Sequence, residues 1–230
     1  MTTSIRVISS MATKALLADL ARMFEAHAPE FTVSIESVGG VDAAKRVQAG
    51  EAFDCVVLAS NAIDQLLTDG KLVAASRVDL VHSGVAVAVP AGAACPDISS
   101  EEALKQAILK ATTLGYSTGP SGVQLAKLFE RWGIAEQIKD KIVQAKPGVP
   151  VGSLIAQGEV ALGFQQLSEM MGVQGITVLG PLPDAVQITT TFSGSIAVTS
   201  TQAQAVQAML AFWASQVTAD AKVQHGMHTA

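Results

Sequence analysis

The sequence is poor in the features that define several large classes of protein. Aromatic residues make up 4% and charged residues 15% of its 230 positions, and no run of 18 apolar residues exists that could span a membrane. The net charge of −5 is spread along the chain without a basic block, which argues against a nucleic-acid partner. Apolar residues, mostly small aliphatic ones, make up 49% of the chain, as expected of a globular protein with a sizeable core.

The sequence also holds few residues that could form disulfides or bind a metal. Cys55 lies inside an apolar run, and Cys95 precedes a proline in a loop, so the two predict free thiols rather than a disulfide framework. His225 and His228 fall in what the pattern indicates is a loose C-terminal tail. We therefore expect no metal site and no cofactor.

The first residues do not resemble a signal peptide, because no basic segment is followed there by an apolar stretch. The sequence as written favours a cytoplasmic location, in which case no transporter partner is expected. A periplasmic location is the alternative if a signal peptide was removed.

Short apolar runs alternate with segments of helical periodicity along most of the chain. A β-branched run at 5–8 comes first, and apolar residues then recur at helical spacing as far as 24. Further predicted strands are 31–36, 55–58, 85–89, 113–116, 160–164, 188–192 and 196–199, and further predicted helices are 41–50, 60–70, 101–110, 123–132, 152–157 and 201–217. Such alternation is typical of parallel sheets with crossover helices and predicts an α/β fold.

Small polar residues recur where a predicted strand ends and a helix begins. Ligands bind outside the carboxyl ends of strands in open parallel sheets, where helix N-termini offer free N–H groups and partial positive charge. This position predicts an anion site without lysine or arginine. Its candidate ligand-binding residues are Ser9, Ser10, Met11, Gly39, Gly40, Ser117, Thr118, Ser121, Gly122, Gln165 and Gln166.

The alternative is that these residues are ordinary caps and turns. The segments 99–102 and 121–124 both match a helix capping box. The loop 117–122, however, holds more hydroxyls and glycines than one cap needs, and a buried glutamine pair must find partners. The weak candidates for a catalytic role are His82, Tyr116 and Glu169.

Four segments carry a family resemblance. They are the first strand with Ser9-Ser-Met-Ala-Thr-Lys-Ala15, then Gly39-Gly-Val-Asp-Ala-Ala-Lys-Arg-Val-Gln-Ala-Gly-Glu51, Ser76-Arg-Val-Asp-Leu80 and Gln157-Gly-Glu-Val-Ala-Leu-Gly163. In this order they resemble the type II periplasmic-binding-protein superfamily, in its molybdate-binding-protein-like branch. The resemblance implies a two-lobed clamshell, with a mostly parallel sheet flanked by helices in each lobe. It implies one lobe from 1–84 and 192–230, a second from 85–191, and a ligand cleft between them.

The resemblance also shows where this chain departs from the oxyanion binders of that branch. Those proteins use serine hydroxyls in the first two strand-end loops and a tyrosine after the strand that corresponds to 160–164. Here Met11 stands near the usual serine of the first loop, the second loop has glycines, and Gln165 and Gln166 replace the tyrosine. The segments 116–123 and 163–169 are similar to the subgroup that contains aconitate isomerase.

Amides and hydroxyls suit an organic carboxylate better than a bare oxyanion, because glutamine both donates and accepts hydrogen bonds. The first hypothesis is therefore a solute-binding protein for a di- or tricarboxylate. The alternative is an isomerase of unsaturated polycarboxylates, which needs a base to move an allylic proton. Molybdate or another oxyanion is a third ligand class. The effector domain of a regulator ranks last, because the sequence as written has no DNA-binding segment before Ile5.

Overall fold

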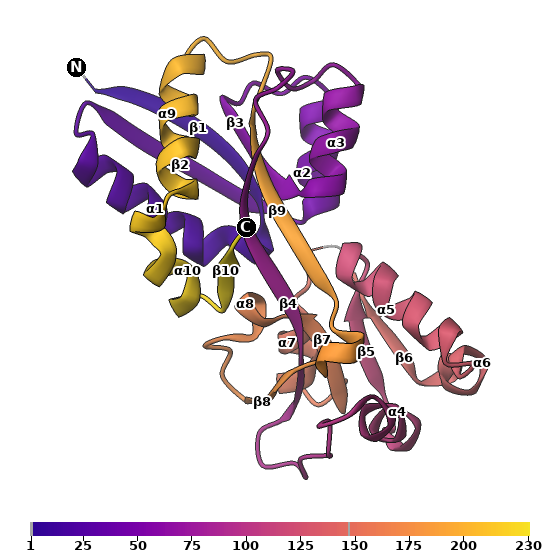
Figure 1. The fold of residues 1–230 in the computed structure, drawn as a ribbon. Helices are drawn as coiled ribbons and strands as arrows, with labels where there is room; N and C mark the ends of the chain where they lie inside the picture. Colours follow the sequence, from indigo (N-terminus) through magenta and orange to yellow (C-terminus); the bar gives the residue numbers. More distant parts are fainter. Residues whose placement is uncertain (1, 147) are drawn as a thin grey trace. The chain divides into compact units, whose positions relative to one another are not determined.

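The computed structural model describes residues 2–146 and 148–230, which divide into two compact units (Figure 1). Unit 1 is Met1–Ser83 with Thr190–Ala230, and unit 2 is Gly84–Thr189. The chain passes from unit 1 to unit 2 inside strand β4 and returns inside strand β9.

Unit 1 contains β1 (Thr3–Ser10), η1 (Met11–Thr13), α1 (Lys14–His27), β2 (Phe31–Val38), α2 (Gly40–Gln48), β3 (Cys55–Ala59), α3 (Ser60–Thr68), the first part of β4 (Val78–Pro90), most of β9 (Thr189–Ile196), α9 (Ala203–Ala214), η4 (Gln216–Thr218), α10 (Ala219–Gln224) and β10 (Met227–Thr229). Its strands follow the order β2-β1-β3-β9-β4, and β10 pairs with β4. The first three are parallel, and β9 runs antiparallel to β3.

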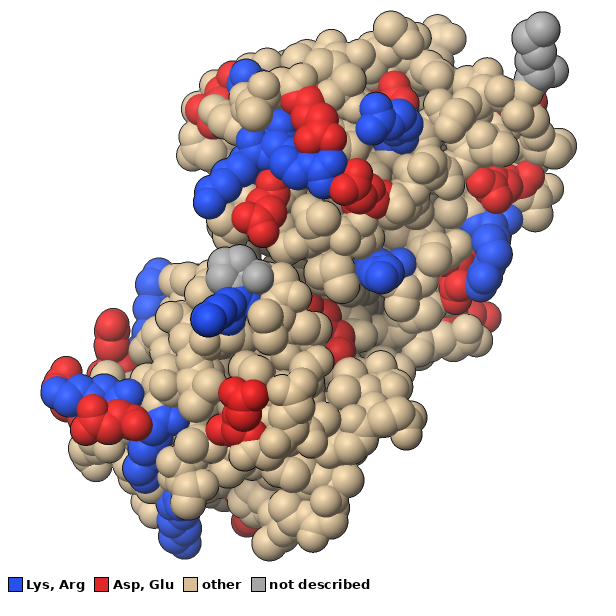
Figure 2. All heavy atoms as spheres, turned by 180° about the vertical axis from the view of Figure 1, so that it is seen from behind, with Lys and Arg blue, Asp and Glu red and all other residues tan. Residues whose placement is uncertain are grey.

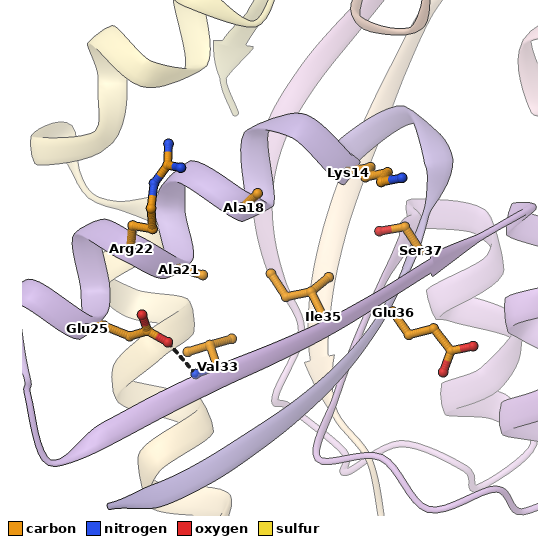
Figure 3. A pocket seen from close by; sticks show the side chains of 9 residues that line it. All are labelled: Lys14, Ala18, Ala21, Arg22, Glu25, Val33, Ile35, Glu36 and Ser37. Carbon is orange, nitrogen blue, oxygen red and sulfur yellow. Dashed lines mark hydrogen bonds between the residues drawn. The ribbon is translucent and has the colours of Figure 1, made fainter.

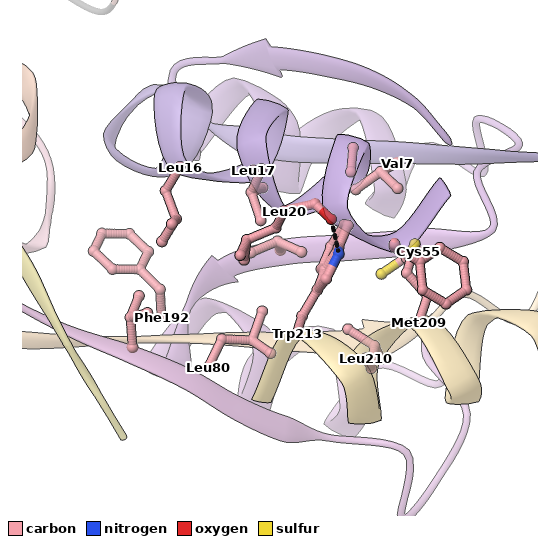
Figure 4. Packing of buried hydrophobic residues seen from close by; sticks show 14 of the residues in the cluster. Val7, Leu16, Leu17, Leu20, Cys55, Leu80, Phe192, Met209, Leu210 and Trp213 are labelled. Atoms are coloured by element: carbon pink, nitrogen blue, oxygen red, sulfur yellow. Dashed lines mark hydrogen bonds between the residues drawn. The ribbon is translucent and has the colours of Figure 1, made fainter. Parts of the chain in front are cut away.

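The core of unit 1 is built from aliphatic side chains around one tryptophan (Figure 4). Trp213 of α9 is fully buried, and its indole N–H donates to the Leu20 carbonyl oxygen of α1 at 3.1 Å. Cys55 lies in the same cluster as a free thiol whose pKa is raised by burial, whereas Cys95 is exposed. The prediction of two free cysteines is confirmed.

Unit 2 contains the rest of β4 and β9, together with α4 (Glu101–Lys110), β5 (Leu114–Ser117), α5 (Pro120–Arg131), α6 (Ala135–Ile138), η2 (Lys139–Lys141), β6 (Ile142–Ala145), α7 (Val151–Ala156), β7 (Leu162–Gln166), α8 (Leu167–Met170), β8 (Ile176–Pro181) and η3 (Asp184–Val186). Its strands follow the order β6-β5-β7-β4, with β8 also paired to β4. Strands β6, β5 and β7 are parallel, and β4 is antiparallel to β7.

The two units therefore repeat one strand order. In unit 1 the parallel strands lie in the order β2-β1-β3, and the antiparallel strand β9 follows β3. In unit 2 the parallel strands lie in the order β6-β5-β7, and the antiparallel strand β4 follows β7. In this arrangement the crossovers diverge between the first and third strands, and that point is the usual ligand position in open α/β sheets. This point of divergence lies at the carboxyl ends of β1 and β3 in unit 1 and of β5 and β7 in unit 2.

Some local predictions are wrong. Helix α5 begins at Pro120 with Gly119 as its N-cap, so Ser121 lies inside the first turn instead of capping the helix, because proline favours the first helical position. The other capping box correctly predicts α4, although Ser100 rather than Ser99 is its N-cap. Ser100 accepts the Ala103 N–H at 3.1 Å.

The end of the chain also differs from the prediction. A single strand, β9, replaces the two strands predicted at 188–192 and 196–199, because buried Ser193 and Ser195 continue it with hydroxyls bonded to Asp79 and Ser76. The predicted loose tail is ordered as α10 and β10. There the His225 ring contacts the Asp19 carboxylate of α1, Nε2 to Oδ2, at 2.8 Å.

Candidate functional site

The candidate site of unit 1 lies at the carboxyl ends of β1 and β2. Their parallel register pairs Ser9 with Ser37 and Ser10 with Val38, so the two strands end side by side. Met11 begins the 3₁₀ turn η1, and Gly39 is the N-cap of α2, whose first residue is Gly40. The ends of these strands therefore lie beside helix starts, as the sequence predicted.

The two serines of β1 have different environments. Ser9 is fully buried, and its Oγ lies 2.8 Å from the Oγ of Ser37. Ser10 is 7% exposed, and its Oγ has no hydrogen-bond partner among the described residues. A Cβ on Gly40 would lie 3.6 Å from the Ser10 Cβ, which places Ser10 beside the start of α2. A buried hydroxyl without a partner costs roughly 1–3 kcal/mol, which a ligand atom could offset.

Ser37 is a site residue that the sequence reasoning missed. The strand was predicted to end at Glu36, and the loop after it was described as lacking a serine. In the structure β2 continues to Val38, and the parallel register brings Ser37 opposite Ser9. Continuing the alternation that starts at Phe31 by one more step would have placed Ser37 within the strand.

A groove of about 540 Å³ runs along α1 and β2 in unit 1 (Figure 3). Its lining residues are Lys14, Ala18, Ala21, Arg22, Glu25, Val33, Ile35, Glu36 and Ser37. The Glu25 carboxylate accepts the Val33 N–H at 2.7 Å and so satisfies an outward-facing group of this edge strand. Ser9 and Ser10 are not among the lining residues, but Ser37, which pairs with Ser9, is, so the groove adjoins the strand-end site.

The candidate site of unit 2 begins at the loop between β5 and α5. The Ser117 Oγ accepts the Gly119 N–H at 3.3 Å, Thr118 is exposed, and Ser121 is 8% exposed in the first turn of α5. A Cβ on Gly122 would lie 1.8 Å from the Ser117 carbonyl oxygen. Glycine at 122 is thus required for α5 to approach β5, which gives it a packing role.

The end of β7 carries a connected group of polar side chains. Gln165 and Gln166 are both 3% exposed. The Gly152 N–H, in the first turn of α7, donates to the Gln165 Oε1 at 3.2 Å, which leaves the Gln165 NH₂ group as a donor. The Glu169 side chain hydrogen-bonds to Gln165. Gln165 therefore links the start of α7 to a carboxyl group in α8.

Glu169 differs electrostatically from the other described carboxyl groups. Burial raises its pKa to about 7, although the hydrogen bond from Gln165 acts in the opposite direction. By contrast, the pKa is lowered at the carboxyl groups of Glu36, Glu51, Asp79 and Asp97. A carboxyl group that titrates near neutrality can either donate or accept a proton under physiological conditions.

Tyr116 and His82, the two other catalytic candidates, have described contacts of their own. Tyr116 packs edge-to-face on Phe129, at 6.0 Å between ring centroids, on the sheet face that α5 covers. Gln165 contacts α7 on the opposite face. His82 belongs to unit 1, where its Nδ1 lies 3.0 Å from the Thr191 Oγ1 on β9. The described contact of Tyr116 is thus a packing contact, and that of His82 is with a hydroxyl of β9.

These observations define an α/β protein of two units whose strand ends present neutral donors. Residues 5–228 match the family of bacterial extracellular solute-binding proteins, and the chain belongs to this family. It is similar to an aconitate isomerase from a Pseudomonas species, with 40% identity over 187 residues that cover 79% of this chain and 70% of that protein.

Solved structures confirm the fold prediction. The periplasmic molybdate-binding protein of Azotobacter vinelandii is similar with a TM-score of 0.80 and 15% identity, covering 97% of this chain and 98% of that one. The sulfate-binding protein of Mycobacterium tuberculosis H37Rv is similar with a TM-score of 0.78 and 17% identity, covering 98% and 86%. The chain has the type II periplasmic-binding fold, as the resemblance implied.

The surface, the ionisable side chains and the helices add three observations. Positive and negative side chains are intermingled on the face in Figure 2. In residues 2–146 and 148–230, no group of three or more His, Cys, Asp or Glu side chains is arranged to hold a metal ion. No helix in the same residues is long and apolar enough to cross a membrane.

Proposed function

We propose that the protein binds a small organic anion, a di- or tricarboxylate, with polar groups at the ends of its strands. The observation that carries this proposal is the buried, unpartnered Ser10 hydroxyl beside the start of α2. A carboxylate oxygen would accept from this hydroxyl and from free N–H groups of the helix start. The Gln165 amide supplies a donor of the same kind in unit 2.

A calorimetric titration series tests this function. The ligands are di- and tricarboxylates of graded length, with molybdate and sulfate as the competing class. We expect Ser10→Ala to weaken carboxylate binding about tenfold, because it removes one hydrogen bond to a charged group. Ser34→Ala, on the exposed face of β2, is the matched control. Tighter binding of molybdate or sulfate than of every carboxylate would contradict the proposed ligand class.

A second candidate function is isomerisation of an unsaturated polycarboxylate. It is favoured by the 40% identity to an aconitate isomerase and by a carboxyl group at Glu169 that exchanges its proton near neutral pH. In such a reaction a base removes a proton from the methylene carbon, the double bond shifts, and a proton is returned to the far alkene carbon. No oxidant or reductant is needed, because the substrate and product have the same composition.

Incubation with trans-aconitate in deuterated water distinguishes the two functions. Formation of the cis isomer with deuterium at a carbon position supports catalysis, and Glu169→Gln is then expected to slow it by at least 100-fold. Saturable binding without isomerisation or deuterium uptake supports a binding protein and rejects the enzyme.

A further inference from the structure

Glu169 raises a problem for an anion-binding protein. Its half-buried carboxyl group lies directly after the strand that presents Gln165 and Gln166. An ionised carboxylate at this position would repel a carboxylate ligand, and incomplete hydration makes that repulsion stronger than in water. The surroundings of Glu169 therefore decide which charge state can coexist with the ligand.

The described elements of unit 2 that pack against α8 contain no lysine, arginine or histidine. Helix α8 packs against β7 and β8, and α7 packs against the same two strands. The sequence from 151 to 182, which includes all four elements, has two ionisable residues, Glu159 and Glu169. Glu159 is exposed in the turn before β7. The strand that pairs with both β7 and β8 is the 84–90 part of β4, and it has no ionisable residue.

The polar contact of Glu169 fixes its position without neutralising it. Gln165 is oriented by the Gly152 N–H and hydrogen-bonds to the Glu169 carboxyl group. This amide can donate one hydrogen bond to Glu169, but it carries no charge. The second carboxyl oxygen of Glu169 has room to face a ligand, because the side chain is partly exposed. Gln165 is thus a positioning residue for Glu169.

We propose that Glu169 takes up a proton when the anion binds and that its neutral carboxyl group then donates a hydrogen bond to a ligand carboxylate. The inference rests on the proposed anion-binding function and deepens it, because it assigns unit 2 a proton-linked recognition group. When an anion binds to the protein with Glu169 ionised, one proton moves from the solvent to Glu169, and no covalent bond of the ligand changes. Its consequence is an affinity that falls as the pH rises above neutrality.

The test uses propane-1,2,3-tricarboxylate, which has three carboxylates and no double bond to isomerise. Its dissociation constant is measured by calorimetry from pH 6 to pH 9, and the number of protons taken up is obtained at pH 8 from buffers of different ionisation enthalpy. We expect uptake of about one proton per ligand, and an affinity that falls about tenfold per pH unit above neutrality. At pH 8 the ligand itself is ionised, so the protein supplies the group that is protonated.

Two variants identify that group. Glu169→Gln keeps a hydrogen-bond donor but cannot titrate, so it is expected to bind within a few-fold of the wild type at pH 6 and to lose both the proton uptake and the decline in affinity. Glu159→Gln, the other carboxyl group of 151–182, should behave as the wild type. Wild-type binding with no proton uptake, or uptake that persists in Glu169→Gln, overturns this inference alone. Absence of binding by every carboxylate over the whole pH range overturns the proposed function with it.

Discussion

The two units have the same strand order but present different chemistry at the same edge. In unit 1, the ends of β1 and β2 carry the hydroxyls of Ser9, Ser10 and Ser37. In unit 2, the end of β7 carries the amide of Gln165 and the titratable carboxyl group of Glu169. One backbone arrangement can thus carry hydroxyls in one unit and an amide with a carboxyl group in the other, because the arrangement fixes where the strand ends meet and the sequence fixes which atoms they expose.

The largest effect is expected from the glycines that bring helices close to strands. Gly122→Ala would place a Cβ 1.8 Å from the Ser117 carbonyl oxygen, so α5 must move away from β5. We expect a loss of about 3 kcal/mol in the free energy of unfolding, at the upper end for an overpacked site. Gly40→Ala makes an ordinary contact with Ser10 at 3.6 Å and should leave the free energy of unfolding unchanged or raise it by up to about 1 kcal/mol, because alanine favours a helix over glycine. Urea denaturation measures both, and equal losses would contradict this difference between the units.

The next effect concerns how stability depends on pH. Glu169 has a pKa near the ordinary 4.5 when unfolded and about 7 when folded, so between these values the native state binds more protons than the unfolded state. The contribution of Glu169 to stability is therefore present below the unfolded pKa and is lost as the pH rises towards 7 and beyond. We expect a loss on the order of 2 kcal/mol between pH 4.5 and 8, reduced by partial exposure.

Comparing the wild type with Glu169→Gln at both pH values isolates this loss from the other carboxyl groups. The glutamine variant should be the more stable protein at pH 8 and show no such advantage at pH 4.5. The opposite pattern would mean that the carboxyl group of Glu169 is stabilised in its charged form.

The smallest effect separates the two neighbouring serines of unit 1. Ser9→Ala removes the partner of Ser37 and should lower the free energy of unfolding by about 1 kcal/mol. Ser10→Ala removes a buried hydroxyl with no partner in the described residues, so stability should stay the same or rise by up to about 1 kcal/mol. Thermal unfolding of both variants without ligand checks the sign, and a destabilised Ser10→Ala would contradict the assignment of a free hydroxyl.

Most of the fold could be predicted from periodicity, because the elements that build it are strongly patterned. The apolar run at 55–58 became the fully buried strand β3, and the helix predicted at 101–110 has those bounds in the structure. The predictions failed where small polar residues continue a strand, as Ser193 and Ser195 do in β9. Such residues are ambiguous in sequence, since their hydroxyls find partners only after distant segments pack together.

The sequence by itself determined the α/β class, the strand ends that carry polar side chains, and the identity of the donors there, because these follow from local periodicity and residue type. Tertiary structure decided which of those residues lie in contact with one another. The register of β1 and β2 paired Ser9 with Ser37, and the packing of α7 on β7 gave Gln165 a fixed partner in Gly152. Burial then raised the pKa of Glu169 and packed Tyr116 against Phe129. Pairing and desolvation depend on residues far apart in the chain, so no local pattern encodes them.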